Sequence, residues 1–510
     1  MEVFRRASGI HSPRQVTEDY SPPMQPLLKD QSLLKTQAYA AGHWCDARSG
    51  KVLEVRDPAD GQLLGSVPSL CAEEVEEAIL AAHRAMALWK KEPAGFRSKI
   101  LRRWFDLIIE HTDDLAAILT AEQGKPLAEA RGEISYAGSF VEWFAAEANR
   151  IDGEIISAPS ADRRILVLKE PVGVCAAITP WNFPSAMVTR KVAPALAAGC
   201  AILVKPASRT PLSPLALAIL ALRAGLPEGL FSIITGEASV IGSAFTKSPE
   251  VRKLSFTGST EIGKSLIRDC AGTVKRVTME LGGNAPFIVF ADADLEAAIE
   301  GVMTSKFRGS GQTCICPNRI LVDARVEERF TELLATAIRK LSVGPGTMQG
   351  VMQGPLIDHS ALKHVENLID DAVTKGAKVL VGGKRHPLGG TFFEPTLLTG
   401  CTPFMQLARC EIFGPIAPIF TFKNEEEAII LANATEYGLA GYFYSRDLAR
   451  VWRVAEALEC GMVGVNTGFI SNAASPFGGI KESGYGREGS HHGLNDYLAL
   501  KYLCVAGLGS

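Results

Sequence analysis

Three kinds of feature are missing from this sequence of 510 residues, and each absence excludes a class of protein. The longest apolar run, at 215–222, falls far short of the roughly 20 residues that cross a bilayer, so we expect no membrane span. No Cys-x-x-Cys pair and no His-Glu-x-x-His motif occurs, which leaves a metal site without support. The formal net charge is only −3, so we expect no nucleic-acid surface.

A disulfide framework is also not expected. The 11 cysteines are odd in number and scattered, and no signal peptide precedes them. We therefore expect reduced thiols in a cytoplasmic protein, or in the mitochondrial matrix if the source is eukaryotic. The chain is 47% hydrophobic and 21% charged, which suits two or three globular domains. Prolines and few aromatic residues in 1–34 predict a flexible N-terminal extension.

Short apolar segments alternate with helical patterns between residues 172 and 290. The predicted strands are 174–178, 201–204, 231–234 and 252–256, and the predicted helices are 185–198, 211–224, 239–245 and 260–270. This alternation is typical of a parallel, doubly wound sheet with helices on both faces. Ligands of such sheets bind beyond the carboxyl ends of the strands. A less regular alternation continues to about residue 465 and predicts a second α/β domain.

A glycine-rich segment at 307–319 contains a candidate nucleophile. Gly309 and Gly311 give the backbone unusual freedom shortly before Cys314. Its thiol becomes a good nucleophile only if the surroundings lower the thiol pKa from roughly 8.5. Main-chain amides of a tight turn can lower that pKa and can also bind an oxyanion. Taken alone, Cys314 and Cys316 would be interpreted as two buried structural cysteines.

Residues 258–265 match a different motif, the phosphate-binding loop G-x-x-x-x-G-K-S/T. The motif follows a predicted strand and opens a predicted helix, and Asp292 ends another strand where a magnesium ligand could lie. However, the motif lies deep in the chain, after several βα units. A nucleotide hydrolase also does not need the thiol, acid and amide described below. A P-loop nucleotide hydrolase is therefore a remote alternative.

Seven short motifs together resemble the aldehyde dehydrogenase family. They are Thr-Pro-Trp-Asn-Phe-Pro at 179–184, Val-Lys-Pro-Ala at 204–207, Phe-Thr-Gly-Ser at 256–259, Met-Glu-Leu-Gly-Gly-Asn at 279–284, Gly-Gln-Thr-Cys at 311–314, Glu-Ile-Phe-Gly-Pro at 411–415 and Pro-Phe-Gly-Gly at 476–479. They occur in the order of that family, and the resemblance covers residue 39 to the C-terminus. Cys-Ile-Cys at 314–316 and Asn-Thr-Gly-Phe-Ile-Ser at 466–471 bring it closest to the succinate-semialdehyde dehydrogenases.

The resemblance implies an α/β architecture in three parts. A doubly wound NAD(P)-binding domain would comprise 35–151 and 172–284, and a second α/β domain, the catalytic one, would comprise 285–470. Segments 152–171 and 488–510 would form a small β oligomerisation arm. An exposed strand edge favours aggregation unless another subunit covers it, so we expect a homodimer or homotetramer.

The resemblance also implies roles for three residues, and the chemistry is consistent with them. Cys314 would attack the aldehyde to give a thiohemiacetal, which can release hydride and leave a thioester. The side-chain amide of Asn182 and the main-chain N–H of Cys314 would bind the oxyanion. Glu280 would be the base for thioester hydrolysis. The alternatives are that Asn182 is only a turn residue, that Glu280 is a surface charge, or that the chain keeps the fold without catalysis.

The G-x-G-x-x-G dinucleotide fingerprint is absent from the first βα turn, so the resemblance assigns the cofactor to other residues. They are Trp181, Lys205, Ser208, Gly258, Ser259, Gly263, Leu281, Glu411 and Phe413. NAD-restricted relatives often have a glutamate where this chain has Ser208, and its carboxylate would repel a 2′-phosphate. With Arg209 adjacent, we expect NADP to be preferred and NAD to be possible. The alternative is that Ser208 only caps the helix near Pro211.

The expected substrate is a short semialdehyde. Arg190, Arg308 and Ser471 match the carboxylate-binding positions of succinate-semialdehyde dehydrogenase, and a guanidinium binds a carboxylate through two parallel hydrogen bonds. Succinate semialdehyde is the first expectation and glutarate semialdehyde, one methylene longer, the second. The arginines could instead be structural ion-pair partners. Cys316 could close a reversible disulfide with Cys314 on oxidation, or could simply pack in the core.

Overall fold

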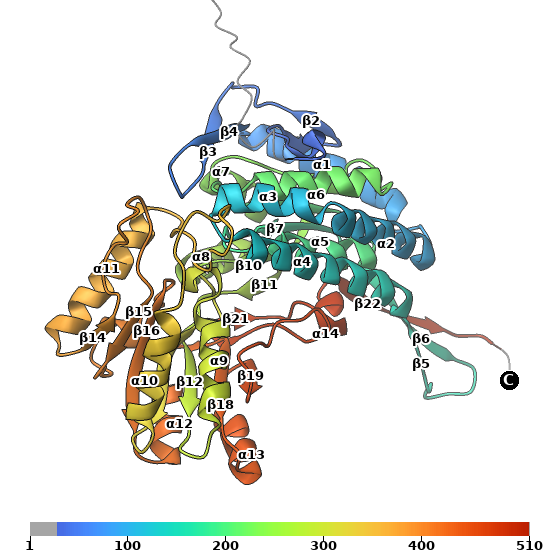
Figure 1. Ribbon diagram of the computed structural model, residues 1–510. Coiled ribbons are helices and arrows are strands. Elements are labelled where there is room, and N and C mark those ends of the chain that lie inside the picture. The colour runs from blue at the N-terminus through green and yellow to red at the C-terminus, as the bar shows by residue number, and fades with distance from the viewer. Residues whose placement is uncertain (1–27, 509–510) are drawn as a thin grey trace, which may run out of the picture.

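The computed structural model describes residues 28–508, which form two α/β bodies and a projecting β arm (Figure 1). Most of the predicted N-terminal extension therefore lies outside the described residues. Its last part is packed: Leu28 is buried, the Lys29 amide donates to Asp114 Oδ1 at 2.8 Å, and a short 3-10 helix follows at Gln31–Leu33. The folded body thus begins before residue 35, earlier than predicted.

An eight-stranded sheet forms the centre of the first body. Across the sheet the strands are β2 (His43–Cys45), β1 (Ala38–Ala40), β9 (Phe231–Ile233), β8 (Ile202–Lys205), β7 (Val174–Ile178), β10 (Val251–Thr257), β11 (Arg276–Glu280) and β21 (Gly484–Tyr485). From β9 to β11 all neighbours are parallel, as predicted. The edges differ, because β1 runs antiparallel to β9 and β21 antiparallel to β11. Both edge strands come from distant segments that the local alternation does not include.

Helices cover both faces of this sheet, which explains why its strands are apolar on both sides. α5 (Ala186–Ala198) and α6 (Leu212–Arg223) pack on one face under α2 (Ala94–Glu110), α3 (Thr112–Gln123) and α4 (Leu127–Glu147). The other face carries α1 (Ala72–Trp89), α7 (Ala238–Lys247) and α8 (Thr260–Ala271). α5 ends at Gly199, whose φ of 96° is a left-handed conformation that glycine adopts without strain. Helix α3 was not predicted.

A seven-stranded sheet forms the second body. Its order is β14 (Lys378–Val381), β15 (Thr396–Thr399), β16 (Ile416–Phe422), β13 (Pro317–Asp323), β12 (Ala285–Val289), β18 (Ala440–Tyr444) and β19 (Met462–Val465), parallel except for β14. The helices are α9 (Leu295–Lys306), α10 (Glu327–Ile338), α11 (His359–Thr374), α12 (Glu425–Asn433) and α13 (Leu448–Ala457). Separate apolar clusters fill its two faces. The predicted second α/β domain is present, although α9, α13, β15 and β18 were not predicted.

The arm is a three-stranded antiparallel sheet, β22 (Leu498–Val505), β6 (Arg164–Pro171) and β5 (Glu154–Ile156), which projects from the body in Figure 1. Large apolar side chains are exposed on it, including Ile155 at 81% and Leu500 at 70%. The predicted arm segment at 488–510 starts too early, because α14 (Ser490–Asn495) packs against α4 and α5 of the first body. The remaining strand pairs are β3 (Val52–Arg56) with β4 (Leu63–Pro68), and β17 (Tyr437–Gly438) with β20 (Ile480–Lys481).

Among residues 28–508, no helix combines the length and the apolar character that a membrane crossing would require.

Candidate active site

The predicted catalytic residues lie between the two bodies. The first sheet presents its carboxyl edge to this site, and the second sheet presents its amino edge. The turns after β7, β10 and β11 lie at the carboxyl edge of the first sheet, where Asn182, Gly258 and Glu280 are found. The loop that holds Cys314 instead precedes β13, at the amino edge of the second sheet. The first sheet therefore follows the usual rule for ligand binding in doubly wound folds. The second sheet supplies its nucleophile from the other end.

Glycines allow the Cys314 loop to pack tightly. Residues 309, 310 and 311 have φ of 58°, 55° and 74°, a left-handed run that two glycines make accessible. A Cβ on Gly311 would lie 2.1 Å from the carbonyl oxygen of Gly414, and a Cβ on Gly283 would lie 2.1 Å from that of Cys314. These close approaches bring the loop against the turn after β11 and the segment before β16. The predicted backbone freedom is thus used to pack three segments together.

The surroundings of Cys314 raise the pKa of its thiol, and the turn amides do not offset this rise. The pKa of this thiol is raised to about 12, chiefly by burial and also by the nearby carboxylates of Glu411 and Glu280, while Arg190 opposes the rise. The amides of the turn are local to Cys314, whereas the two acids are brought in by segments far away in the chain. A base must therefore remove the proton before the sulfur can attack.

Glu280 has the character of the base expected for thioester hydrolysis. Its side chain is buried, and both carboxyl oxygens lack a hydrogen-bond partner within the described part of the chain. Burial, and next the Glu488 carboxylate, raise its pKa well above the usual range, while Arg190 and Lys191 oppose the rise. Glu280 is therefore not the surface charge of the alternative interpretation. A raised pKa makes a carboxylate a stronger base at the pH where it is ionised.

Asn182 lies directly opposite the Cys314 loop. It is buried, and its Nδ2 donates to the carbonyl oxygen of Gln312 at 2.9 Å, two residues before the nucleophile. That bond uses one of the two amide hydrogens, so the other can be donated to an oxyanion. Its Oδ1 is buried without a hydrogen-bond partner among residues 28–508. Asn182 thus links two active-site loops, which a simple turn residue would not do.

One pocket beside Cys314 contains all three predicted substrate residues. Its lining comprises Tyr136, Phe183, Met187, Arg190, Arg308, Thr313, Cys314, Ile315, Ser471 and Phe477. An adjoining cavity of about 580 Å³ shares Tyr136 and Arg308 and has mostly apolar walls. The hydroxyl of Tyr136 is buried and has no hydrogen-bond partner in the described structure. Tyr136 carries no sequence signal, because it lies within an ordinary helix 178 positions before Cys314 in the chain.

The two arginines of the pocket differ in their partners. Arg190 forms an ion pair with Glu488 through Nε, and its Nη2 contacts Met187 Sδ at 2.9 Å. Arg308 has no ion pair or side-chain hydrogen bond within 28–508, and its guanidinium stacks 4.7 Å from the Phe183 ring centroid. Arg308 is therefore a positive charge whose donors remain available to a ligand. Arg190 is partly the structural ion-pair residue of the alternative interpretation.

The residues assigned to the cofactor lie at the carboxyl edge of the first sheet, except Glu411 and Phe413, which reach it from the segment before β16, and the set offers groups that suit a dinucleotide. Lys205 is buried, which lowers its pKa to about 8, and its Nζ donates to Ser208 Oγ at 3.3 Å. Helix α8 follows Ser259, and no side chain within the described residues caps its first amides, so they can bind a phosphate. A Cβ on Gly258 would clash at 2.4 Å with Phe256, as one on Gly263 would with Leu281.

Two further features bear on the roles that the family resemblance assigns to Glu411, Phe413 and Arg209. Glu411 accepts from the Gly283 amide at 3.1 Å, and burial raises its pKa to about 8. The rings of Trp181 and Phe413 meet edge to face at 5.5 Å. Arg209, expected to add charge near Ser208, instead pairs with Asp358 at 2.7 Å.

The capping interpretation of Ser208 is wrong. Helix α6 begins at Leu212, and its first amides, those of Leu212 and Ser213, donate to Glu122 at 2.7 and 2.8 Å. Ser208 is exposed and accepts from Lys205. Its hydroxyl is therefore free to face a ligand at the cofactor edge.

The structure does not support the phosphate-binding loop. β10 ends at Thr257 and α8 begins at Thr260, so only two residues are left where a P-loop wraps around phosphates. Lys264 points to the surface and pairs with Glu482 at 2.7 Å. The motif letters are thus satisfied by a tight βα turn and a surface ion pair.

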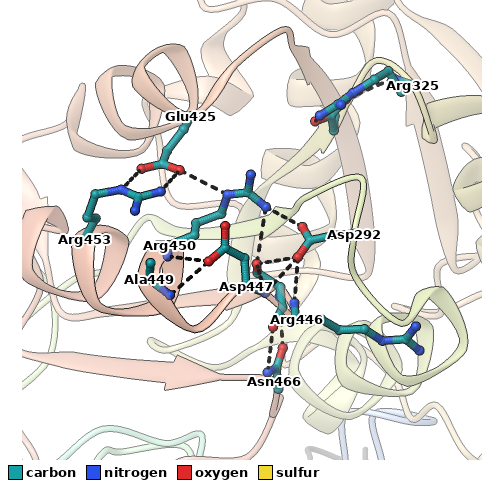
Figure 2. Close-up of polar contacts among 11 residues, drawn as sticks. Asp292, Arg325, Glu425, Arg446, Asp447, Ala449, Arg450, Arg453 and Asn466 are labelled. Atoms are coloured by element: carbon teal, nitrogen blue, oxygen red, sulfur yellow. Dashed lines mark hydrogen bonds and ion pairs between the residues drawn. The ribbon is translucent and has the colours of Figure 1, made fainter.

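Asp292, the second feature of the hydrolase alternative, is a structural acid. It accepts from the Ser445 hydroxyl and from the Arg446 and Asp447 amides at 2.8–2.9 Å. It also pairs with Arg450, and Figure 2 shows these two side chains facing each other. Arg450 also binds Glu425, which pairs with Arg453. This network closes the carboxyl edge of the second sheet, away from Cys314. Among the described residues, no group of three or more histidine, cysteine, aspartate or glutamate side chains could hold a metal ion.

Cys316 is buried two residues after the nucleophile. Its Sγ contacts the carbonyl oxygen of Lys306 at 3.3 Å, and burial raises its thiol pKa. Lys306 itself is fully buried, and its Nζ has no hydrogen-bond partner within residues 28–508. Cys316 is packed in this arrangement, and a disulfide with Cys314 stays a prediction.

Comparison with known proteins agrees with this geometry. The profile of the aldehyde dehydrogenase family matches residues 44–503. The chain is 59% identical to a 3-sulfolactaldehyde dehydrogenase of Pseudomonas putida, over 94% of this chain and 99% of that one. It is 58% identical to a glutarate-semialdehyde dehydrogenase of Pseudomonas aeruginosa, with coverage of 94% and 100%. It is 56% identical to the NADP(+) succinate-semialdehyde dehydrogenase of Escherichia coli, with coverage of 94% and 99%.

Solved structures give the same result. A succinate-semialdehyde dehydrogenase from Burkholderia pseudomallei superposes with a TM-score of 0.93 at 60% identity, covering 94% of this chain and 99% of that one. An NADP-dependent enzyme of Escherichia coli also superposes with a TM-score of 0.93, at 56% identity, with coverage of 94% and 100%. The expected fold class, an aldehyde dehydrogenase-like α/β fold, is thereby confirmed.

Proposed function

Because this chain belongs to the aldehyde dehydrogenase family, we propose that it oxidises a short semialdehyde, with succinate semialdehyde as the preferred substrate. The observation that carries the proposal is Arg308, a cation without an ion-pair partner in the described structure, in the same pocket as Cys314. A carboxylate at the far end of a short aldehyde would meet its guanidinium while the carbonyl meets the sulfur.

The residues of the site support a covalent mechanism. The Cys314 thiol loses its proton to solvent and the thiolate attacks the carbonyl carbon, and the new oxyanion accepts from the free Asn182 N–H and the Cys314 amide. The bound nicotinamide cofactor supplies the hydride acceptor. The product is then a thioester on Cys314. Glu280 takes a proton from the water that attacks this thioester and passes it to the departing sulfur, which releases the acid and restores both the thiol and the carboxylate.

NADP is the proposed cofactor. Ser208 provides no carboxylate that would repel a 2′-phosphate, and its Oγ already accepts from Lys205. The positive charge for the phosphate would come from Lys205, since Arg209 is paired with Asp358. The Escherichia coli relative uses NADP(+), which points the same way. NAD remains a possible second cofactor.

Two other acids are candidate substrates. Glutarate semialdehyde differs by one methylene, which hydrophobic pockets discriminate by only about 1–3 kcal/mol. A sulfonate-bearing aldehyde is favoured by a separate observation, the unpartnered Tyr136 hydroxyl beside Arg308 in the described structure. A sulfonate has three acceptor oxygens, and Arg308, Ser471 and Tyr136 together offer donors for them. The Pseudomonas putida relative acts on such a substrate according to its name.

The test is Arg308→Ala, measured as kcat/KM on succinate semialdehyde and on uncharged butanal. A charge-assisted hydrogen bond contributes about 1.5–3 kcal/mol, so we expect a loss of roughly 10- to 100-fold on the semialdehyde and little on butanal. Arg325→Ala is the matched control, because Arg325 is exposed and pairs with Asp323 at the far edge. Equal losses on both substrates would show that Arg308 supports the loop and does not bind the carboxylate.

We also propose that the arm pairs with a second copy of the chain. Its strands expose apolar side chains on a sheet edge that extends away from the body. A homodimer or a tetramer of dimers would cover them.

A further inference from the structure

A buried ion pair lies behind the Asn182 loop and takes no part in the mechanism described above. Lys125 and Glu133 face each other with side chains only 2% and 1% exposed. Lys125 belongs to the turn between α3 and α4, and Glu133 to the second turn of α4. Buried ion pairs often stabilise a fold no better than apolar residues of similar volume, so their presence calls for another explanation.

Lys125 contacts the backbone and the ring of the Asn182 loop. Its Nζ donates to the main-chain oxygen of Asn182 at 2.8 Å and lies 4.1 Å from the centroid of the Phe183 ring. The turn that carries Lys125 is itself closely packed. Gly124 has φ of 89°, and a Cβ there would lie 2.7 Å from Pro355 and 2.8 Å from Pro58. The ammonium therefore has little freedom to move away from the loop.

Glu133 connects the same pair to the start of helix α5. Its Oε1 accepts from the amides of Ser185 and Ala186 at 2.9 and 3.3 Å, and the other oxygen pairs with Lys125. The carboxylate favours the positive end of the α5 dipole. The peptide of Asn182 is thus held on one side by Lys125, while the helix that follows it is held by Glu133.

The direction of the Asn182 amide decides whether it can bind an oxyanion. Its Nδ2 donates one hydrogen to the Gln312 carbonyl oxygen, and its second hydrogen remains available to the substrate. A donor must point to the place where charge develops, and a misplacement of about 1 Å can cost on the order of 100-fold in rate. Holding the main chain of Asn182 in place fixes the position from which its side chain extends.

We propose that Lys125, with Glu133 as its counter-ion, is a positioning residue that sets the direction of the Asn182 amide. The inference rests on the proposed function, in which Asn182 stabilises the oxyanion. Lys125 touches neither substrate nor cofactor in this proposal and acts only through the loop at 181–183.

A double-mutant cycle tests the proposal. The rate of the first-turnover burst of NADPH is measured for the wild type, Lys125→Met, Asn182→Ala and the double variant, with butanal as substrate so that carboxylate binding plays no part. We expect a loss of about 100- to 1,000-fold for Asn182→Ala and about 10- to 100-fold for Lys125→Met. Because Lys125 acts through Asn182, the double variant should be no slower than Asn182→Ala alone. Multiplied losses, or an unchanged rate in Lys125→Met, overturn the inference.

Several controls separate positioning from folding. Lys275→Met is the matched control, because Lys275 is also buried and donates to main-chain oxygens, those of Ser248 and Val251, away from the site. Its burst rate should match the wild type. Lys125→Met should alkylate at Cys314 with iodoacetamide within about twofold of the wild-type rate, because that reaction needs no oxyanion donor. Slowed alkylation would mean that Lys125 supports the whole site, and would overturn the specific role.

Two further variants keep the test decisive. If Lys125→Met does not fold, the pair Lys125→Met/Glu133→Gln removes both charges and leaves an oxygen for the α5 amides. Lys125→Arg should restore at least part of the burst rate, and no restoration counts against the proposal. A burst that is unchanged in Asn182→Ala would instead overturn the oxyanion role in the proposed function, which distinguishes the two failures.

Discussion

Cys314 and Glu280 are both buried in the active site, and this burial affects the protonation of each. Burial raises the pKa of both groups, so that the thiol and the acid each hold their proton more tightly than in water. A protonated Glu280 cannot accept the proton of the attacking water. The enzyme should therefore gain activity as pH rises above neutrality, where the ionised fraction of both groups increases. The pH profile of kcat/KM checks this expectation.

At Glu280 the two half-reactions can be separated. Glu280→Gln should leave the hydride step largely intact and slow thioester hydrolysis, because the amide cannot take a proton from water. The expected trace is a burst of about one reduced cofactor per active site, followed by slow turnover. Glu482→Gln, on an exposed acid that pairs with Lys264, is the control. A slowed burst in Glu280→Gln would assign this residue to an earlier step.

The preference between NADP and NAD should depend on the charge of the side chain at position 208. Ser208→Glu should lower kcat/KM for NADP on the order of 100-fold while changing that for NAD only a few-fold, because two like charges would lie close together. Ser208→Gln introduces a side chain of nearly the same size as glutamate but without its charge, and should leave the preference for NADP over NAD unchanged. An unaltered NADP to NAD ratio in Ser208→Glu would show that another group binds the 2′-phosphate.

The sequence predicts the site residues that lie within local motifs and misses those that lie outside them. Cys314 and Gly311 stand in a segment whose backbone needs glycine, so their neighbourhood leaves a mark in the sequence. Tyr136 and Lys125 reach the site from the α3–α4 region, and no local pattern records where their side chains end. The raised pKa of Cys314 has the same origin, because Glu411 approaches it from nearly a hundred residues away in the chain.

Helices α3 and α6 are joined by a single buried acid. Glu122, at the end of α3, accepts the first amides of α6 and thereby replaces a side-chain cap from that helix's own sequence. Burial raises the pKa of Glu122 to about 8. Its usual value is about 4.5, so the folded protein holds this proton more tightly than the unfolded chain does.

The raised pKa of Glu122 should make the stability of the protein depend on pH. Between about pH 4.5 and pH 8, Glu122 keeps its proton in the folded protein but loses it in the unfolded chain. Rising pH therefore favours the unfolded chain, and the free energy of unfolding should decrease by up to a few kcal/mol. Glu122→Gln should flatten this part of the stability curve. Glu110→Gln, on an exposed residue of α2, should not. Melting temperatures at fixed protein concentration between pH 5 and pH 8.5 provide the measurement, and parallel curves for wild type and Glu122→Gln would refute the assignment.

Elements with a clear period were predicted closely, and elements fixed by distant contacts were not. Strand β7 was expected at 174–178 and is found at Val174–Ile178. The edge strand β21 is short and pairs with β11, far away in sequence, so its hydrogen bonds leave no local period. The P-loop match failed for a related reason, since its letters do not specify the length of the turn.

On the scale of the whole molecule, the arm provides the surface for self-association. Leu500 and Tyr502 lie on one face of β22 and are 70% and 61% exposed. Leu500→Asp should weaken the oligomer, because a charge would be buried in an apolar contact. Leu448→Asp is the matched control, an exposed leucine on α13 outside the arm. Sedimentation velocity at micromolar concentration distinguishes them, and an unaltered oligomer in Leu500→Asp would place the interface elsewhere.

The network of Asp292, Arg450 and Glu425 has a practical consequence for handling this enzyme (Figure 2). It closes the edge of the second sheet that is opposite the nucleophile, and α13 beside it exposes Leu448 and Trp452 to solvent. A dye, a surface linker or a fused domain attached at Leu448, the first residue of α13, would therefore lie at the sheet edge opposite the nucleophile. The protein could be tethered to a support through this helix with its pocket still open to aldehyde in solution.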